Sequence, residues 1–270
     1  MQPSPASPDR IRFDQPKAGL QRLSARFGGH AYDLHRHETY AVGLTIWGAQ
    51  SFHYRGSLRT SRAGQVMIIH PDEAHDGHAG VDRGFAYRML YVDPGAVGAA
   101  LEDAPPPFVP EVVTEDPVLS ALLGEAFGDF PRPLEPLAQD AIVGRLAERL
   151  AARSDGRRLR PGPAARRAVA LARDFLDAEA HRTVASEELE RLSGLDRFAL
   201  ARHFRTVRGT SPHRYQVGRR LLEAQRLIAE GMKPAEAAAT TGFADQSHLT
   251  RHFASRFGVT PGRWATLARA

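Results

Sequence analysis

The sequence predicts an α+β multidomain protein, with a β-rich N-terminal part and an all-helical C-terminal part. Short runs of aromatic and β-branched residues, separated by Gly, Pro and Asp, fill residues 20–93. Helical periodicity begins near Asp116 and dominates the rest of the 270-residue chain. The charges divide similarly: residues 1–150 carry 14 Lys/Arg and 19 Asp/Glu, a net charge of −5, whereas residues 151–270 carry 22 and 12, a net charge of +10. The basic half indicates contact with a polyanion, although a solvated charged surface explains the asymmetry equally well.

Composition and motifs exclude several classes of protein. The absence of cysteine excludes disulfide scaffolds, cysteine-ligated zinc, iron–sulfur clusters and a cysteine nucleophile. The polar N-terminus has no apolar core of a signal peptide, and the longest apolar run, residues 40–49, is half of a bilayer span. We therefore expect a cytoplasmic protein without membrane contact. No P-loop, G-x-G-x-x-G, G-x-S-x-G or H-E-x-x-H motif is present, so we expect no enzyme.

The elements are predicted in chain order. Residues 1–19 are expected to be flexible, and residues 20–150 to form the first folded domain. Its clearest strands are 44–47, 51–54, 66–69 and 87–92, as in a sandwich or barrel. After the Pro-rich break at 103–110, apolar residues at helical spacing predict two helices, one with Leu119, Leu122, Leu123 and Phe127, the other with Leu137, Ala141, Leu146 and Leu150. The second helix suits dimerisation and core packing equally. Residues 151–163 are expected to be a linker.

Residues 164–270 contain an approximate internal repeat with an offset of 49 residues. It pairs Leu200 with Leu249, Arg202 with Arg251, Phe204 with Phe253, Gly209 with Gly258 and Tyr215 with Trp264. Each copy predicts a short helix (186–192 and 234–240), a tight turn at Gly194 or Gly242, and a second helix capped by Asp196 or Asp245. This order is typical of a helix-turn-helix unit. Two such units in a basic segment favour DNA binding over a helical bundle with a packing role only.

The second helix of each unit is expected to bury one face and present the other to DNA. The candidate DNA-contacting residues are Phe198, Ala201, Arg202 and Arg205 in the first unit and Gln246, Ser247, Thr250 and Arg251 in the second. A connecting helix is predicted from Ser211-Pro212 to Glu230, about 28 Å long at ~1.5 Å per residue. Because adjacent major grooves on one face lie ~34 Å apart, this helix suits placing both units on one duplex.

These motifs closely resemble the AraC/XylS family of transcriptional regulators over residues 165–268. The resemblance rests on Ala201-Arg202-His203-Phe204-Arg205, Gly209-Thr210-Ser211-Pro212, residues 220–224, and the runs 242–249 and 257–261. It implies two helix-turn-helix units that bind double-stranded promoter DNA, in an activator that contacts RNA polymerase. Glu190 and Ala237 depart from the small residue and the isoleucine usual in the family, and Ala201 from a polar one.

Seven of the 12 histidines fall between His30 and His78. Gly29-x5-His35-x-His37, followed by Gly48, and Gly64 with Pro71 and His75 resemble the two motifs of the cupin barrel, which implies a cupin-like sensor domain for a small-molecule effector. His35 and His37 share one face of a strand, and Trp47 shares it if the strand runs unbroken. A barrel could bring His75 opposite them.

The chemistry of the histidine group is left open by the sequence. The position of the usual fourth ligand, a glutamate, holds Ala41 or Val42, and Glu38 should point the other way. We expect His35, His37, Trp47 and His75 to line an effector pocket and expect no cofactor, with a divalent metal on the three histidines and plain structural histidines as alternatives. A metal-dependent cupin enzyme and a non-specific nucleic-acid binder remain the competing functions.

Overall fold

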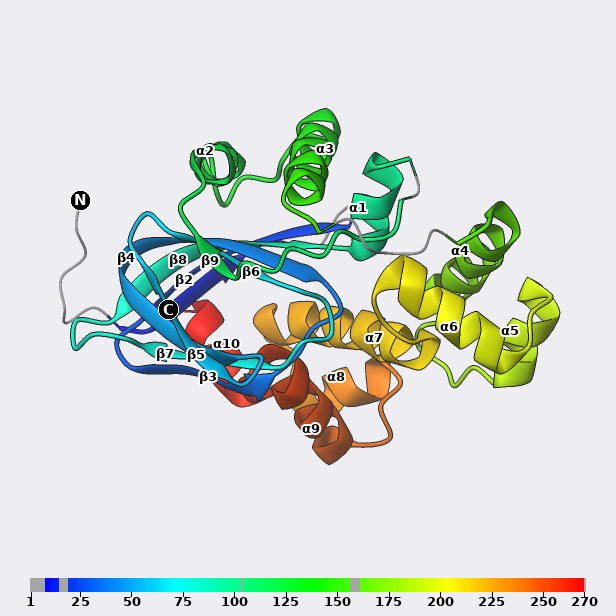
Figure 1. Cartoon of the computed structure of the whole chain (residues 1–270). Coiled ribbons are helices and arrows are strands. Elements are labelled where there is room, and N and C mark those ends of the chain that lie inside the picture. The colour runs from blue at the N-terminus through cyan, green and yellow to red at the C-terminus, as the bar shows by residue number, and fades with distance from the viewer. Residues whose placement is uncertain (1–7, 15–18, 103, 156–160, 270) are drawn as a thin grey trace.

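The structure, a computed structural model, describes residues 8–14, 19–102, 104–155 and 161–269. It has a β-barrel with helices at the N-terminus and a helical domain at the C-terminus (Figure 1). The strands are β1 (Arg10–Phe13), β2 (Leu20–Phe27), β3 (His30–His35), β4 (Tyr40–Tyr54), β5 (Ser57–Arg62), β6 (Val66–Ile69), β7 (His75–Ala79), β8 (Phe85–Val92) and β9 (Val113–Thr114). The helices are α1 (Pro94–Ala100), α2 (Pro117–Ala126), α3 (Pro136–Ala152), α4 (Pro163–Ala178), α5 (Ser186–Ser193), α6 (Arg197–Arg208), α7 (Pro212–Ala229), α8 (Pro234–Thr240), α9 (Gln246–Phe257) and α10 (Pro261–Arg269).

The barrel consists of two antiparallel sheets that share the long strand β4. One sheet has the order β1-β2-β8-β4-β6-β9, and in the other β7 pairs with β3 and β4 while β5 pairs with β4. The predicted strands 44–47 and 51–54 are therefore parts of one strand. The pairing of β4 with β8 shifts register between Thr45 and Trp47, and this irregularity bends the strand from one sheet into the other.

Part of the predicted flexible N-terminus is a strand, which corrects that expectation. Strand β1 pairs with β2 over its whole length, and Ile11 is buried in the barrel core. Residues 1–7 and 15–18 of the predicted flexible segment lie outside the described residues, as do residues 156–160 of the predicted linker. The linker is also shorter than expected at its start, because α3 continues to Ala152.

Helices α1, α2 and α3 cover one face of the barrel (Figure 1) and close a core with β-strand residues. The face of α3 that packs inward contains Ile142, Val143, Leu146, Ala147 and Leu150. The predicted apolar stripe was partly wrong: Leu137 is 84% exposed and Ala141 is also exposed. Spacings of 4, 5 and 4 residues drift around the helix, so the four predicted positions do not share one face.

The helical domain contains the two predicted helix-turn-helix units. The first comprises α5 and α6, and the second comprises α8 and α9; the connecting helix α7 runs from Pro212 to Ala229 with Ser211 as its cap, as predicted. Gly194 and Gly242 adopt the left-handed backbone conformation at the two turns, with φ of +70° and +79°. In this conformation a side chain is strained, which explains glycine at both turns.

The barrel and the helical domain are docked together through a shared core and several ion pairs. Buried residues of α7 to α10, among them Leu221, Phe253 and Trp264, belong to one hydrophobic cluster with barrel residues. Acidic barrel residues pair with basic residues of the helical domain, as in Asp93–Arg208 (2.8 Å), Asp72–Arg214, Glu38–Arg256 and Asp9–Arg263 (3.8 Å). Part of the charge asymmetry thus serves the contact between the two halves.

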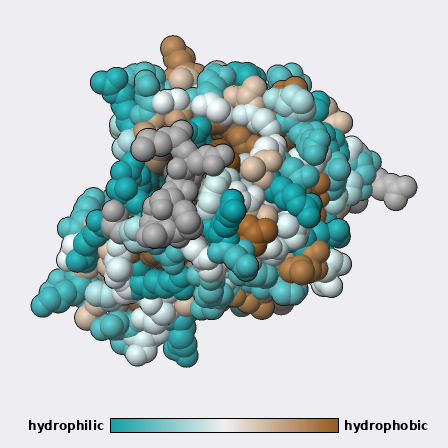
Figure 2. Space-filling model, turned by 90° about the vertical axis from the view of Figure 1, so that its left-hand side faces the viewer, coloured by the Kyte–Doolittle hydropathy of each residue, from teal (hydrophilic) through white to brown (hydrophobic). Residues whose placement is uncertain are grey.

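The surface and the helices show two further features. The face seen in Figure 2 is mostly hydrophilic, with hydrophobic side chains in small separate groups. Among the described residues, no helix has the length and apolar composition needed to cross a bilayer.

Candidate functional site

The candidate DNA-contacting residues lie on accessible parts of α6 and α9. In α6, Phe198 is 71% exposed, Arg202 and Arg205 are exposed, and Ala201 is half-buried. In α9, Gln246, Ser247 and Arg251 are exposed and Thr250 is half-buried. The opposite faces are buried through Leu200 and Phe204 in α6 and Leu249 and Phe253 in α9. Each helix therefore presents to solvent the face that the sequence assigned to DNA.

Local hydrogen bonds fix the start of α6. The Asp196 carboxylate accepts from the backbone N–H groups of Phe198 and Ala199, which lowers the pKa of Asp196. Glu190 of α5 accepts from both the backbone and side chain of Arg197, and Glu187 also pairs with Arg197. The departure from the family at Glu190 thus ties the two helices of the first unit together.

A cavity of about 430 Å³ lies between the barrel and the helical domain. The barrel side includes Gln21, Tyr32, His35, His37 and Tyr91, and the helical side includes Arg173, Arg208, Arg219, Gln225, Arg256 and Trp264. Several of its guanidinium groups are paired with carboxylates, as in Arg208–Asp93 and Arg219–Asp177 (2.9 Å). The lining is therefore mixed in character, with aromatic surface beside paired charges and neutral polar groups.

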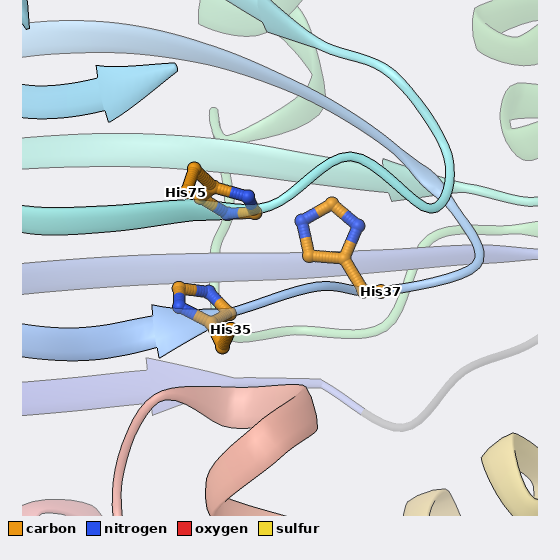
Figure 3. Close-up of side chains that lie close together, drawn as sticks. All are labelled: His35, His37 and His75. Carbon is orange, nitrogen blue, oxygen red and sulfur yellow. The ribbon is translucent and has the colours of Figure 1, made fainter. Parts of the chain in front are cut away.

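Three buried histidines come together in the barrel (Figure 3), and two of them, His35 and His37, line this cavity. His35 ends β3, His37 follows in the turn, and His75 starts β7, which pairs with β3 at His35. One ring nitrogen from each lies within 4.8 Å of the others. The sequence predicted this convergence of His35, His37 and His75.

Hydrogen bonds define which nitrogen of each ring faces its neighbours. The Nδ1 atoms of His35, His37 and His75 lie 2.8, 2.9 and 3.0 Å from the carbonyl oxygens of Asp33, Thr39 and Glu73. Because a carbonyl oxygen only accepts, each Nδ1 carries the proton and each Nε2 carries a lone pair. The Nε2 of His37 is buried and has no hydrogen-bond partner among the residues that the structure describes.

Electrostatics keep these three imidazoles neutral near pH 7. Burial lowers the pKa of His75 to about 4. Burial, followed by the charge of His75, lowers the pKa of His35 and His37 well below their usual range, and the charge of Arg256 adds to the effect on His37. The cluster can therefore accept hydrogen bonds or coordinate a cation through three neutral nitrogens.

Trp47 lies apart from the histidines, contrary to its expected place beside them. It is absent from the residues that line the cavity, and the Arg26 guanidinium lies 5.3 Å from the centre of its ring. The turn after His35 and the register shift before Trp47 break the side-chain alternation on which the expectation depended.

Two residues that the sequence argument did not assign to the site complete it. Arg256, near the end of α9, is buried and pairs with Glu38, which follows His37. Burial lowers the pKa of Arg256 to about 9, so the guanidinium keeps its charge at pH 7. Their meeting depends on the docking of the two domains, for which the sequence carries no local signal.

Comparison with protein families identifies both halves of the chain. Residues 17–147 match the family model described as "AraC-like ligand binding domain", and residues 189–266 match the model "Helix-turn-helix domain". The chain belongs to the AraC family of transcriptional regulators. This family comprises regulators and not enzymes. The resemblance predicted from the two sequence motifs, including the cupin-like N-terminal domain, is confirmed.

Relatives and solved structures agree with this assignment. The AraC-family chain is 26% identical over 231 residues to the uncharacterized HTH-type transcriptional regulator YbfI of Bacillus subtilis, covering 83% of this chain and 84% of YbfI. It is 28% identical over 102 residues to the probable transcriptional regulator LumQ of Photobacterium leiognathi, covering 37% and 41%. Its fold is similar to that of ToxT from Vibrio cholerae O395, with a TM-score of 0.66, 11% identity and coverage of 93% and 99%.

Proposed function

We propose that this AraC-family regulator binds promoter DNA in a sequence-specific manner and that a small molecule in the interdomain cavity controls its activity. The cavity carries this proposal, because barrel and helical-domain residues line it together. A small molecule in the cavity would contact both domains. It would shift the equilibrium between an arrangement with the two domains docked and one with them released, to the extent that it binds one arrangement more tightly than the other. A ToxT structure with 12% identity and a TM-score of 0.64 is described as bound to an unsaturated fatty acid, which supports a search among small carboxylic acids.

The exposed faces of α6 and α9 support the DNA-binding half of the proposal. Phe198, Ala201, Arg202 and Arg205 would contact one major-groove segment, and Gln246, Ser247, Thr250 and Arg251 the next. Bound there, the regulator would act as a cytoplasmic activator that contacts RNA polymerase at the promoter. Transcription in vitro from a template with a selected binding site tests activation: we expect more transcript with the regulator present, and a decrease would indicate repression instead.

Ligand control is tested with a cavity-filling variant. Leu222 of α7 lines the cavity, so Leu222→Trp should abolish the thermal stabilisation that an effector gives to the wild-type chain. Leu171→Trp, at a 38% exposed position of α4 outside the cavity lining, is the matched control and should respond like wild type. A small-molecule screen would supply the effector. Equal stabilisation of both variants would place the effector elsewhere and contradict the cavity.

The exposed start of α3 supports a homodimer. Leu137 is 84% exposed, and contact with a second copy of the chain would remove this large apolar side chain from water. Light scattering after size-exclusion chromatography should report a dimer for the wild type and a monomer for Leu137→Glu. A monomeric wild-type chain at micromolar concentration would contradict this part of the proposal.

The three histidines favour a second candidate occupant, a divalent transition-metal ion. Three Nε2 lone pairs converge while each Nδ1–H is oriented by a backbone carbonyl, an arrangement typical of metal-binding histidines. Neutral imidazoles suit Zn, Ni, Fe or Cu. Elemental analysis after dialysis against Zn²⁺ should give one metal per chain, lost in the double variant His35→Ala/His37→Ala. Equal metal content in both proteins would contradict this site.

A further inference from the structure

The end of α9 lies against the segment that carries His35 and His37, and its residues Arg256 and Phe257 line the cavity. The backbone N–H of Asp33 donates to the Gly258 carbonyl (2.8 Å), and that of Arg36 donates to the Ser255 carbonyl (2.9 Å). A Cβ at Gly258 would lie 2.8 Å from Nδ1 of His35, so the two segments are in contact. The end of α9, in the DNA-binding domain, therefore contacts the barrel segment that carries the candidate metal ligands His35 and His37.

A buried ion pair joins the two domains at this point. The side chain of Arg256 is 7% exposed and that of its partner Glu38 is 19% exposed. Glu38 follows His37 in the chain, and Arg256 and His37 line the same cavity. Gly218 of α7 completes the enclosure, because a Cβ there would approach both Glu38 and Arg256. Arg256 and Glu38 contribute one positive and one negative charge, which balance each other in this enclosed space.

Resting on the metal site proposed above, we propose that a divalent cation on His35, His37 and His75 replaces Arg256 as the charge partner of Glu38 and so releases α9 from the barrel. The cation would add two positive charges beside a guanidinium that is sheltered from water, where repulsion is weakly screened. Departure of Arg256 removes one positive charge and leaves the Glu38 carboxylate to balance the cation. The metal therefore binds the released arrangement more tightly and shifts the equilibrium toward it.

Zn²⁺ titration of the full chain by calorimetry tests the charge argument with variants of opposite sign. Arg256→Gln removes the repelling charge and should tighten Zn²⁺ binding about tenfold. Glu38→Gln removes the balancing charge and should weaken it about tenfold. Arg256→Lys loses the guanidinium geometry but keeps the charge, and should stay close to wild type. Circular dichroism checks that each variant is folded, and if Arg256→Gln is not, the weakening in Glu38→Gln decides.

Release of α9 is measured separately by energy transfer between two dyes. The chain has no cysteine, so Arg59→Cys on the barrel and Glu236→Cys in the helical domain, both at exposed positions, allow specific labelling. Zn²⁺ should lower the transfer efficiency in this labelled protein and leave it unchanged after His35→Ala/His37→Ala. Absence of stoichiometric Zn²⁺ binding would overturn the metal site itself. Zn²⁺ binding with equal affinity in all variants, or with unchanged energy transfer, would overturn the coupling alone.

Discussion

Replacement of Gly258 by alanine should separate the DNA-binding domain from the barrel. Gly258 has φ of +67°, a conformation that costs a non-glycine residue ~1–2 kcal/mol. The new Cβ would also lie 2.7 Å from Cβ of Tyr32, 2.8 Å from Nδ1 of His35 and 2.9 Å from the carbonyl oxygen of Asp33. The contact with the Asp33 carbonyl oxygen is to the backbone of β3, which cannot turn aside as a side chain can, so we expect the end of α9 to move away from β3.

That movement removes several interactions at once. Two interdomain backbone hydrogen bonds, to the carbonyls of Gly258 and Ser255, contribute about 1 kcal/mol each. Separation of Arg256 from Glu38 also breaks an ion pair, but both charges return to water when the domains part, so the net contribution of this pair to docking is small. The expected loss of docking free energy is therefore about 2 kcal/mol, beyond the cost of the backbone conformation.

Gly194→Ala is the matched control. Gly194 has φ of +70°, but no atom lies within 4 Å of the position that a Cβ would take there, so only the backbone cost applies. Energy transfer between dyes on Arg59→Cys and Glu236→Cys should fall in Gly258→Ala and remain unchanged in Gly194→Ala. Urea denaturation should show the ~1–2 kcal/mol backbone cost in both variants, with the loss of docking free energy added in Gly258→Ala. Equal energy transfer in the two variants would refute the docking role of Gly258.

Three further predictions concern DNA reading, the barrel and acid stability. Arg251→Ala should cost ~1–3 kcal/mol of DNA-binding free energy and relax the preference at one base pair; competition gel shifts with single-base variants measure this, and unchanged specificity would remove Arg251 from the interface. Arg22 is 1% exposed and pairs with Asp14 at 2.6 Å, so Arg22→Met should lower the free energy of unfolding by ~3–5 kcal/mol. Urea denaturation measures this loss, and a loss below ~1 kcal/mol would contradict a stabilising role of the Arg22–Asp14 pair. Burial alone would raise the pKa of Asp116, but hydrogen bonds from Arg149 and a backbone N–H lower it overall. Its stabilisation is therefore complete above its ordinary pKa of 3.8 and lost as the pH falls below it; Asp116→Asn should weaken the acid dependence of unfolding, and an unchanged dependence would count against the assignment.

Local signals predicted the helical domain well. Asp196 and Ser211 occupy the capping positions that the sequence assigned to them, and Gly209 ends α6 in the left-handed conformation. These features depend on residues a few positions apart, so a single sequence contains them. The meeting of His35 with His75 also followed, because strand pairing in a barrel is regular, but His37 reaches them from the turn after β3 and not by alternation along a strand.

Predictions of features that depend on long-range packing were wrong or absent. The place of Trp47 depends on a register shift in β4, which only the pairing with β8 reveals. The Glu38–Arg256 pair joins residues that are distant in the sequence and meet only when the domains dock. No local pattern distinguishes this arginine from the other basic residues of the C-terminal half.

Selection of binding sites from a randomised duplex library by the full-length chain tests the central claim most directly. Two reading helices on one connecting helix predict enrichment of two short elements about one helical turn, ~10 base pairs, apart. The selected site should bind at least ~10³-fold more tightly than random DNA at physiological salt. Recovery of no common sequence, with equal affinity for selected and random duplexes, would contradict sequence-specific regulation by this protein.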